Sequence, residues 1–210
     1  MKIKICGVSN LGDATEISAA GADYIGLIFA EKSPRLVAPE SARAIASAGL
    51  SAKLVGVFVD SPADFVRRAV GEYGLSAVQL HGSEDARYVG TLRGLGAEIW
   101  KAVWLSSESD ADEAAQFPCD KLVVDSSRGK LRGGTGVRAD WRLAALLAAR
   151  RECFLAGGIS FGNARKALET VKPYGLDMNS AVEINPRKKN TALISKYLKQ
   201  LKQNENTRIQ

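Results

Sequence analysis

The chain has 210 residues, of which 46% are hydrophobic and 25% charged, with a formal net charge of +6. This is the composition of an ordinary globular domain, and no segment approaches the ~18–20 continuous apolar residues that a membrane span needs. One histidine, His81, and three cysteines without CxxC spacing exclude a metal site that needs several histidines or a zinc-type cysteine set.

The beginning of the sequence and the distribution of charge indicate where the protein works. The start, MKIKICGVSN, is charged and leads directly into an apolar run, so we expect no signal peptide. An odd number of cysteines without a secretory signal favours a reducing cytoplasm. Lys and Arg are dispersed, apart from NPRKKN and the C-terminal tail, so we expect no nucleic acid or membrane partner.

Eight short runs rich in apolar and β-branched residues follow one another along the chain. Their starts lie about 20–30 residues apart, which is the length of a strand, a helix and two loops. Most runs are continuously apolar, which is typical of strands buried on both faces. We predict strands over residues 3–6, 24–29, 53–59, 77–81, 99–104, 121–125, 153–157 and 175–180.

A helical pattern follows each predicted strand. We predict helices over residues 13–21, 41–49, 63–74, 84–96, 112–117, 140–151, 161–171 and 190–201, of which 112–117 is the shortest and weakest. The alternation predicts a parallel sheet and an α/β fold. Eight units favour a closed (β/α)8 TIM barrel over a flavodoxin-like open sheet, which usually has about five strands. We expect one domain over residues 1–201 and a frayed tail over 202–210.

In a (β/α)8 barrel the chemistry lies at the C-terminal ends of the strands, and two titratable residues stand there. Cys6 is either a small buried hydrophobe or a base, which requires nearby cations because a thiol with a pKa of about 8.5 is barely ionised at neutral pH. Asp125 follows an apolar strand, from which we expect desolvation of the carboxyl, as a general acid needs. Alternatively it caps a helix or pairs with Arg128 or Arg132.

Polar residues after other predicted strands are further candidates. Arg35 follows a rigid Ser-Pro turn, and its planar fork suits a carboxylate or phosphate, or a surface salt bridge. Gln79 and His81 alternate, so they share a face, and His81 is either structural or turned to a ligand. Gly157 and Gly158 let backbone N–H groups approach an anion.

Glycine-rich stretches indicate phosphate rather than nucleotide binding. The loops after the seventh and eighth strands of a barrel often form a phosphate site, and LAGGI and NSAVE occur there. The GGTG stretch at 133–136 lacks the spacing of a nucleotide P-loop, and no Rossmann G-x-G-x-x-G occurs.

Seven short motifs occur in one order along the chain. They are KICG at 4–7, GAD with KSPR at 21–35, VGVFVD, VQLHG, VVDSS with GGTG, LAGGI, and D-x-NS-x-VE. Together they resemble the phosphoribosylanthranilate isomerase family of tryptophan biosynthesis, from Lys2 to about Leu201.

The resemblance implies a (β/α)8 barrel without a cofactor that carries out an Amadori rearrangement. N-(5-phosphoribosyl)anthranilate becomes 1-(2-carboxyphenylamino)-1-deoxyribulose 5-phosphate. Asp125 is implied as the general acid and Cys6 as the general base, while Arg35 holds the substrate carboxylate. Gln79 and His81 are expected to position this small phosphorylated substrate. We expect a monomer or a homodimer in the cytoplasm.

The phosphate is expected to bind at two loops and under the GGTG segment, which the resemblance implies folds over the site. The residues assigned to it are Gly134, Thr135, Gly157, Gly158, Asn179, Ser180 and Ala181. The sequence departs from the family at Ser180-Ala181, where serine-glycine is usual. If this position requires a positive φ, alanine is strained there.

Other functions fit the sequence less well. A metal-dependent pentose-phosphate epimerase needs several histidines, and indole-glycerol-phosphate synthase needs a lysine and glutamates that are not recognisable at strand ends. A bifunctional histidine/tryptophan isomerase is expected to carry Asp where Cys6 stands. A non-catalytic binding barrel or a nucleic-acid binder is the alternative from another class. The dispersed charge and the pair Cys6 and Asp125 disfavour it.

Overall fold

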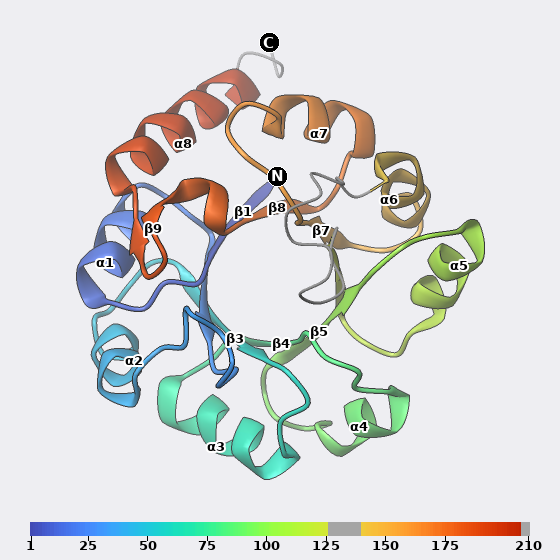
Figure 1. Cartoon of the computed structure of the whole chain (residues 1–210), viewed down its shortest axis with the longest axis horizontal. Coiled ribbons are helices and arrows are strands. Elements are labelled where there is room, and N and C mark those ends of the chain that lie inside the picture. The colour runs from blue at the N-terminus through green and yellow to red at the C-terminus, as the bar shows by residue number, and fades with distance from the viewer. Residues whose placement is uncertain (126–139, 207–210) are drawn as a thin grey trace.

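A computed structural model describes residues 1–125 and 140–206, with side chains as far as residue 201 (Figure 1). Eight parallel strands close into a barrel, each hydrogen-bonded to the next in chain order, and β8 returns to β1. The strands are β1 Lys2–Cys6, β2 Tyr24–Ile28, β3 Lys53–Phe58, β4 Ala77–Leu80, β5 Glu98–Val103, β6 Lys121–Val124, β7 Cys153–Leu155 and β8 Gly175–Met178. The predicted single (β/α)8 barrel is confirmed.

Helices surround this barrel as a ring (Figure 1). They are α1 Leu11–Ala19, α2 Pro39–Ala46, α3 Ala63–Tyr73, α4 Ala86–Thr91, α5 Glu108–Gln116, α6 Trp141–Ala148, α7 Ala164–Val171 and α8 Thr191–Asn206. A short 3-10 helix, η1 Ser180–Val182, and the hairpin β9 Glu183–Asn185 and β10 Lys188–Lys189 lie between β8 and α8. Among the described helices, none is long and apolar enough to cross a membrane.

Several predicted boundaries were wrong, some of them for identifiable local reasons. The fifth helix begins at Glu108 rather than 112, because Ser107 and Asp110 form a reciprocal capping box. The fourth helix ends at Thr91 rather than 96, since Gly94 and Gly96 take φ of 81° and 73°. The last two predicted strands are too long at their C-terminal ends. β7 ends before Gly157, whose φ of 69° no strand adopts.

The C-terminal segment is helical further than the sequence indicated. The helix α8 continues to Asn206, beyond the predicted domain end at 201. Residues 207–210 lie outside the described residues. The domain boundary therefore stays a prediction.

Aromatic side chains close the middle of the barrel beneath its C-terminal rim. Trp100 and Phe154 are fully buried, with ring centroids 4.8 Å apart, and Tyr24 packs edge-on against both. Burying each such side chain contributes roughly 1.5–3 kcal/mol. A second core fills the space between strands and helices. A rigid layer of buried aromatic side chains therefore supports the C-terminal rim of the barrel.

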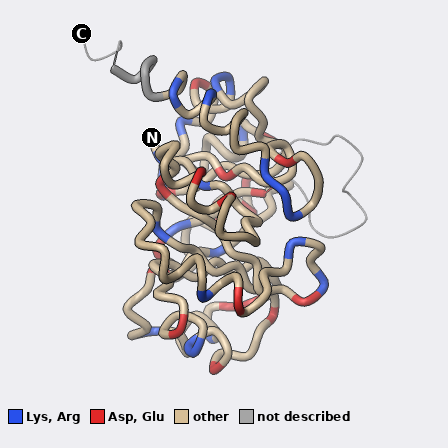
Figure 2. Tube along the Cα trace, turned by 90° about the vertical axis from the view of Figure 1, so that its left-hand side faces the viewer, with Lys and Arg blue, Asp and Glu red and all other residues tan. Residues whose placement is uncertain are grey.

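Charged side chains are mixed over the molecule. Figure 2 shows Lys and Arg interspersed with Asp and Glu along the described trace. Several of the exposed ones pair across neighbouring helices, such as Arg142 with Glu108. This agrees with the dispersed charge of the sequence.

Candidate active site

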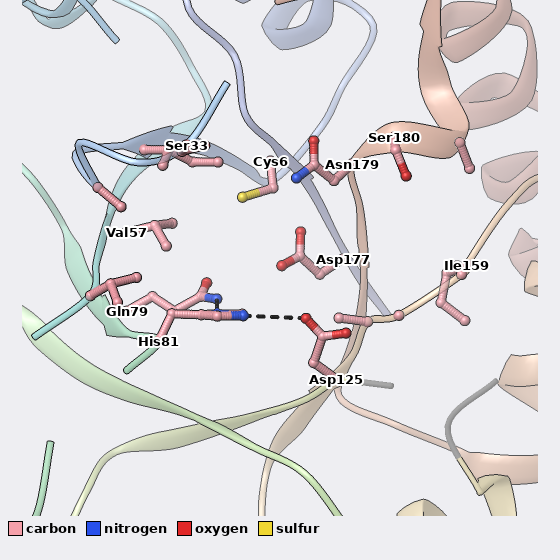
Figure 3. A pocket seen from close by; sticks show the side chains of 17 residues that line it. Cys6, Ser33, Val57, Gln79, His81, Asp125, Ile159, Asp177, Asn179 and Ser180 are labelled. Atoms are coloured by element: carbon pink, nitrogen blue, oxygen red, sulfur yellow. Dashed lines mark hydrogen bonds and ion pairs between the residues drawn. The ribbon is translucent and has the colours of Figure 1, made fainter. Parts of the chain in front are cut away.

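A cavity of about 340 Å³ opens at the C-terminal rim of the barrel, a volume suited to a small ligand (Figure 3). The structure brings together nine of the residues predicted from the sequence. Those lining the cavity are Cys6, Gln79, His81, Asp125, Gly157, Gly158, Asn179, Ser180 and Ala181. Arg35 does not line it, and Gly134 and Thr135 fall outside the described residues.

Cys6 ends β1 and turns its thiol into the cavity (Figure 3). It is 5% exposed. A Cβ added to Gly26 of the neighbouring strand β2 would lie 2.8 Å from Sγ of Cys6, so only glycine leaves room for the thiol. Burial raises the pKa of Cys6, and the nearby ammonium of Lys4 opposes this shift without cancelling it. The raised pKa disfavours the thiolate, so a base at this position needs cationic help.

Lys4 and Asp177 form a buried ion pair below Cys6. The two residues are register partners on β1 and β8, and Nζ of Lys4 lies 2.7 Å from Oδ2 of Asp177. Burial raises the pKa of Asp177, and Lys4 opposes the shift. Oδ1 of Asp177 has no hydrogen-bond partner among the described residues, although the residue lines the cavity. Such an oxygen is a ready acceptor for a ligand hydroxyl.

The carboxyl of Asp125 follows β6 and faces Cys6 from the opposite side of the cavity (Figure 3). Oδ2 of Asp125 lies 3.3 Å from Nε2 of His81. The other ring nitrogen, Nδ1, is 2.9 Å from Nε2 of Gln79. The described partner of Asp125 is thus a histidine, whereas Arg128 and Arg132, which the sequence offered as partners, lie outside the described residues.

Arg35 is engaged in an ion pair. Its Nε and Nη2 donate to Oε1 and Oε2 of Glu183, at 2.8 and 2.7 Å. The side chains of Arg35 and Glu183 are only 19% and 5% exposed, so the pair is half-buried rather than the surface bridge that the sequence left open. Nζ of Lys189 also donates to Glu183, at 2.7 Å. Burial disfavours the charge on Glu183, but these two cations outweigh burial and lower its pKa.

The predicted phosphate loops meet at one side of the cavity. Gly157 and Gly158 take φ of 69° and 73°, the left-handed conformation that favours glycine. Ala181 lies inside η1 and is not among the residues with positive φ, so the strain that its replacement of glycine threatened does not arise. The side chain of Asn179 accepts a hydrogen bond from Nζ of Lys189 at 3.0 Å.

Four polar residues of the site were given no role in the sequence analysis: Lys4, Asp177, Glu183 and Lys189. A local signal existed for the first two. Lys4 and Cys6 alternate on β1, as Asp177 and Asn179 do at β8, and a polar residue at every second position of a buried strand points into a barrel. Glu183 and Lys189 show no such alternation, because they lie after β8 in a hairpin that the sequence does not predict, although Glu183 is the last residue of the D-x-NS-x-VE motif.

A parallel barrel with a thiol and a carboxyl facing each other across its C-terminal rim is the architecture of a (β/α)8 enzyme. A family model described as N-(5'phosphoribosyl)anthranilate (PRA) isomerase matches residues 3–200. The chain therefore belongs to the N-(5'-phosphoribosyl)anthranilate isomerase family.

Individual relatives agree over nearly their whole length. The N-(5'-phosphoribosyl)anthranilate isomerase of Rubrobacter xylanophilus is 37% identical over 199 residues, which cover 94% of this chain and 97% of that one. The crystal structure of the Thermus thermophilus enzyme is 35% identical with a TM-score of 0.85, covering 97% and 99%. A further phosphoribosyl anthranilate isomerase, solved with reduced 1-(o-carboxyphenylamino)-1-deoxyribulose 5-phosphate, is 32% identical with a TM-score of 0.81, covering 95% and 97%.

Proposed function

We propose that this chain converts N-(5-phosphoribosyl)anthranilate into 1-(2-carboxyphenylamino)-1-deoxyribulose 5-phosphate, with Asp125 as general acid and Cys6 as general base. The reaction is an Amadori rearrangement in tryptophan biosynthesis, and the enzyme is an isomerase. One observation carries the assignment of the two residues. Cys6 and Asp125 reach the same cavity from opposite sides (Figure 3).

In the first step, Asp125 gives its proton to the furanose ring oxygen of the substrate. The bond from that oxygen to C1′ breaks, and the nitrogen lone pair forms a C1′=N double bond, which is a protonated Schiff base. Asp125 is left as a carboxylate, and the imidazole of His81, 3.3 Å from its Oδ2, stabilises the new charge. General acid catalysis of this kind contributes roughly 10²–10⁴-fold in rate.

In the second step, the thiolate of Cys6 takes the proton from C2′. The electrons of the C–H bond form a C1′=C2′ double bond and return the electrons of the C=N bond to nitrogen, giving an enolamine. Its C2′ hydroxyl then tautomerises to the ketone as C1′ gains a proton. Lys4 favours the thiolate by its positive charge, which lowers the pKa that burial raises.

The charged ends of the substrate are bound by separate parts of the rim. Arg35 holds the anthranilate carboxylate, and its planar fork suits that group. Gln79 and His81 position the substrate. The phosphate binds at Gly157 and Gly158 and at 179–181; Gly134 and Thr135 belong to the same proposal. We place the enzyme in the cytoplasm, as a monomer or homodimer.

The substrate is tested with purified protein and freshly prepared N-(5-phosphoribosyl)anthranilate. We expect the anthranilate-type fluorescence to disappear and the product to be the aminoketose phosphate by NMR. The aminoaldose phosphate of histidine biosynthesis is the control substrate, and Cys6 at the end of β1 predicts that it is not turned over. A folded protein that leaves N-(5-phosphoribosyl)anthranilate unchanged contradicts the proposal.

A further inference from the structure

A chain of three side chains links β4 to the proposed general acid. Nε2 of Gln79 lies 2.9 Å from Nδ1 of His81, and Nε2 of His81 lies 3.3 Å from Oδ2 of Asp125. Gln79 is 1% exposed, so its amide is held away from bulk water. This arrangement makes the proton position on the imidazole depend on Gln79.

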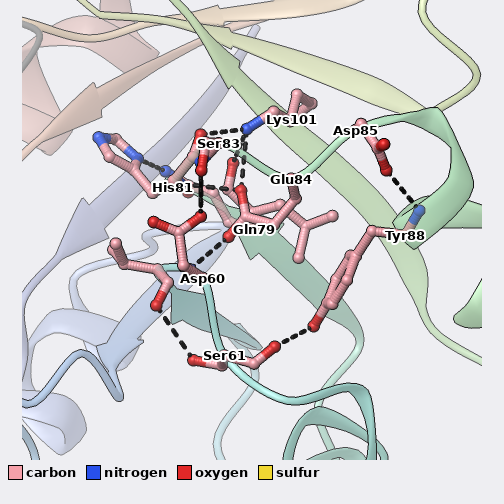
Figure 4. A network of polar contacts seen from close by, with 12 residues as sticks. Asp60, Ser61, Gln79, His81, Ser83, Glu84, Asp85, Tyr88 and Lys101 are labelled. Atoms are coloured by element: carbon pink, nitrogen blue, oxygen red, sulfur yellow. Dashed lines mark hydrogen bonds and ion pairs between the residues drawn. The ribbon is translucent and has the colours of Figure 1, made fainter.

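The imidazole ring itself has little freedom. The backbone N–H of His81 donates to the carbonyl of Phe58 at 2.8 Å, and the ring of Trp104 packs edge-on against the imidazole at 5.6 Å. The loop after β4 is held by Lys101 of β5, whose Nζ donates to the carbonyl of Gly82 at 2.6 Å and to Glu84 at 2.9 Å (Figure 4).

Glu84 fixes the same loop a second time. Its carboxylate accepts from the backbone N–H groups of Asp60 and Gly82, at 2.8 and 2.9 Å (Figure 4). The backbone on both sides of the histidine is thus tied down. These backbone hydrogen bonds do not determine which ring nitrogen of His81 carries the proton.

A neutral imidazole has one donor and one acceptor nitrogen. If Gln79 donates to Nδ1, that nitrogen accepts, and the ring proton lies on Nε2, where it donates to Oδ2 of Asp125. This bond forms whether Asp125 is protonated or not, because Oδ2 only has to accept. With the opposite tautomer, a bare Nε2 faces the carboxyl and competes for the proton that the substrate must receive.

We propose that Gln79 is a positioning residue that fixes His81 as the Nε2–H tautomer, so that His81 occupies Oδ2 of Asp125 and the transferable proton resides on Oδ1. Gln79 then acts on the acid through His81, in addition to the substrate-positioning role that the sequence indicated. The directing role rests on the proposed function of Asp125, whereas the tautomer rests on the orientation of the Gln79 amide, whose Nε2 faces Nδ1 and can only donate.

The chain contains a single histidine, so its imidazole can be read without assignment. In ¹⁵N–¹H correlation spectra of the labelled full-length protein, at a pH where the ring is neutral, we expect the proton on Nε2. In Gln79→Glu the carboxylate accepts a bond and moves the proton to Nδ1. Exposed Gln116 supplies the matched control, since Gln116→Glu leaves the spectrum unchanged. A proton on Nδ1 in the wild type overturns the tautomer assignment, even if Gln79→Glu fails to fold.

Steady-state kinetics test whether Gln79 acts on Asp125 through His81. Gln79→Glu and Gln79→Met should lower kcat by at least about 10-fold, part of the roughly 10²–10⁴-fold that general acid catalysis contributes, with KM little changed. In an Asp125→Asn background the same changes should have no further effect, because residues acting as one unit are not additive. An equal loss in both backgrounds, or a rise in KM alone, overturns action through Asp125.

The failure of the proposed acid is distinguishable from the failure of this inference. If Asp125→Asn retains wild-type activity, the acid is wrong and the directing role falls with it. The spectra of wild type and Gln79→Glu still decide the tautomer in that case.

Discussion

Arg35, in the loop after β2, and Glu183, the first residue of β9, form a bidentate ion pair with N–O distances of 2.8 and 2.7 Å. A guanidinium has five N–H donors, and Glu183 occupies two of them. Arg35 therefore keeps donors for a second carboxylate while Glu183 fixes its orientation. The pair joins opposite ends of the sequence at the rim that also carries Cys6.

Replacing Arg35 by Lys tests whether the guanidinium binds the anthranilate carboxylate. Lysine keeps the charge but loses the planar fork, so we expect KM to rise by about 10-fold, a difference of roughly 1.4 kcal/mol. An aniline analogue of the substrate, without the carboxylate, is the control. Arg35→Lys should not change KM for the analogue, and an equal effect on both substrates would place Arg35 elsewhere.

The lowered pKa of Asp13 predicts how the free energy of unfolding changes in acid. Burial opposes its ionisation, but bonds from Lys188, the N–H of Lys189 and Asn10 outweigh burial and lower its pKa. A depressed carboxyl pKa stabilises the folded state above the unfolded pKa of about 4, and this stability is lost as pH falls through the lower folded value.

The prediction is measured as the free energy of unfolding in urea at neutral pH and at several pH values below about 4. Asp13→Asn should be less stable at neutral pH and lose less stability in acid than the wild type. Exposed Asp64→Asn is the control. Parallel acid curves for wild type and Asp13→Asn contradict the role of this carboxylate.

The pKa of Cys6 predicts the pH dependence of activity. Burial raises it, Asp177 adds to the shift, and Lys4 and Lys189 oppose it; the thiol also interacts with Arg35. Since the base must be the thiolate, kcat/KM should rise with pH to beyond the ordinary thiol pKa of about 8.5.

Lys4→Met removes the nearest cation and should move this rise to higher pH, provided the variant shows a wild-type melting curve. Lys53→Met, at an exposed position on β3, is the matched control. A profile that Lys4→Met leaves in place would show that Lys4 does not support the thiolate.

The ion pair between Lys101 and Glu84 is expected to stabilise the loop that carries His81. The pair is buried, with side chains 8% and 2% exposed. Lys101→Met leaves the Glu84 charge uncompensated, which typically costs about 3–5 kcal/mol. The measurement is the urea midpoint against Lys53→Met. A loss no larger than that of the control contradicts the role of the pair.

Much of this structure was predictable because the strands are buried on both faces. Apolar runs, most of them continuous, marked the eight strands of the barrel, and knowledge that barrel chemistry lies at strand ends led to Cys6, His81 and Asp125. Which residues partner them was not predictable. Lys4 and Asp177 are 173 positions apart, and only closure of the barrel brings them together. The helix α5 was underestimated because its start depends on a cap rather than on apolar spacing.

The most direct test of the acid–base pair is turnover of N-(5-phosphoribosyl)anthranilate by Cys6→Ser and Asp125→Asn. Cys119→Ser and Asp64→Asn serve as matched controls, since neither residue lines the cavity. We expect both site variants to keep the wild-type melting curve and to lose at least about 10²-fold in kcat, while the controls retain activity. Wild-type turnover in folded Asp125→Asn or Cys6→Ser would contradict the account.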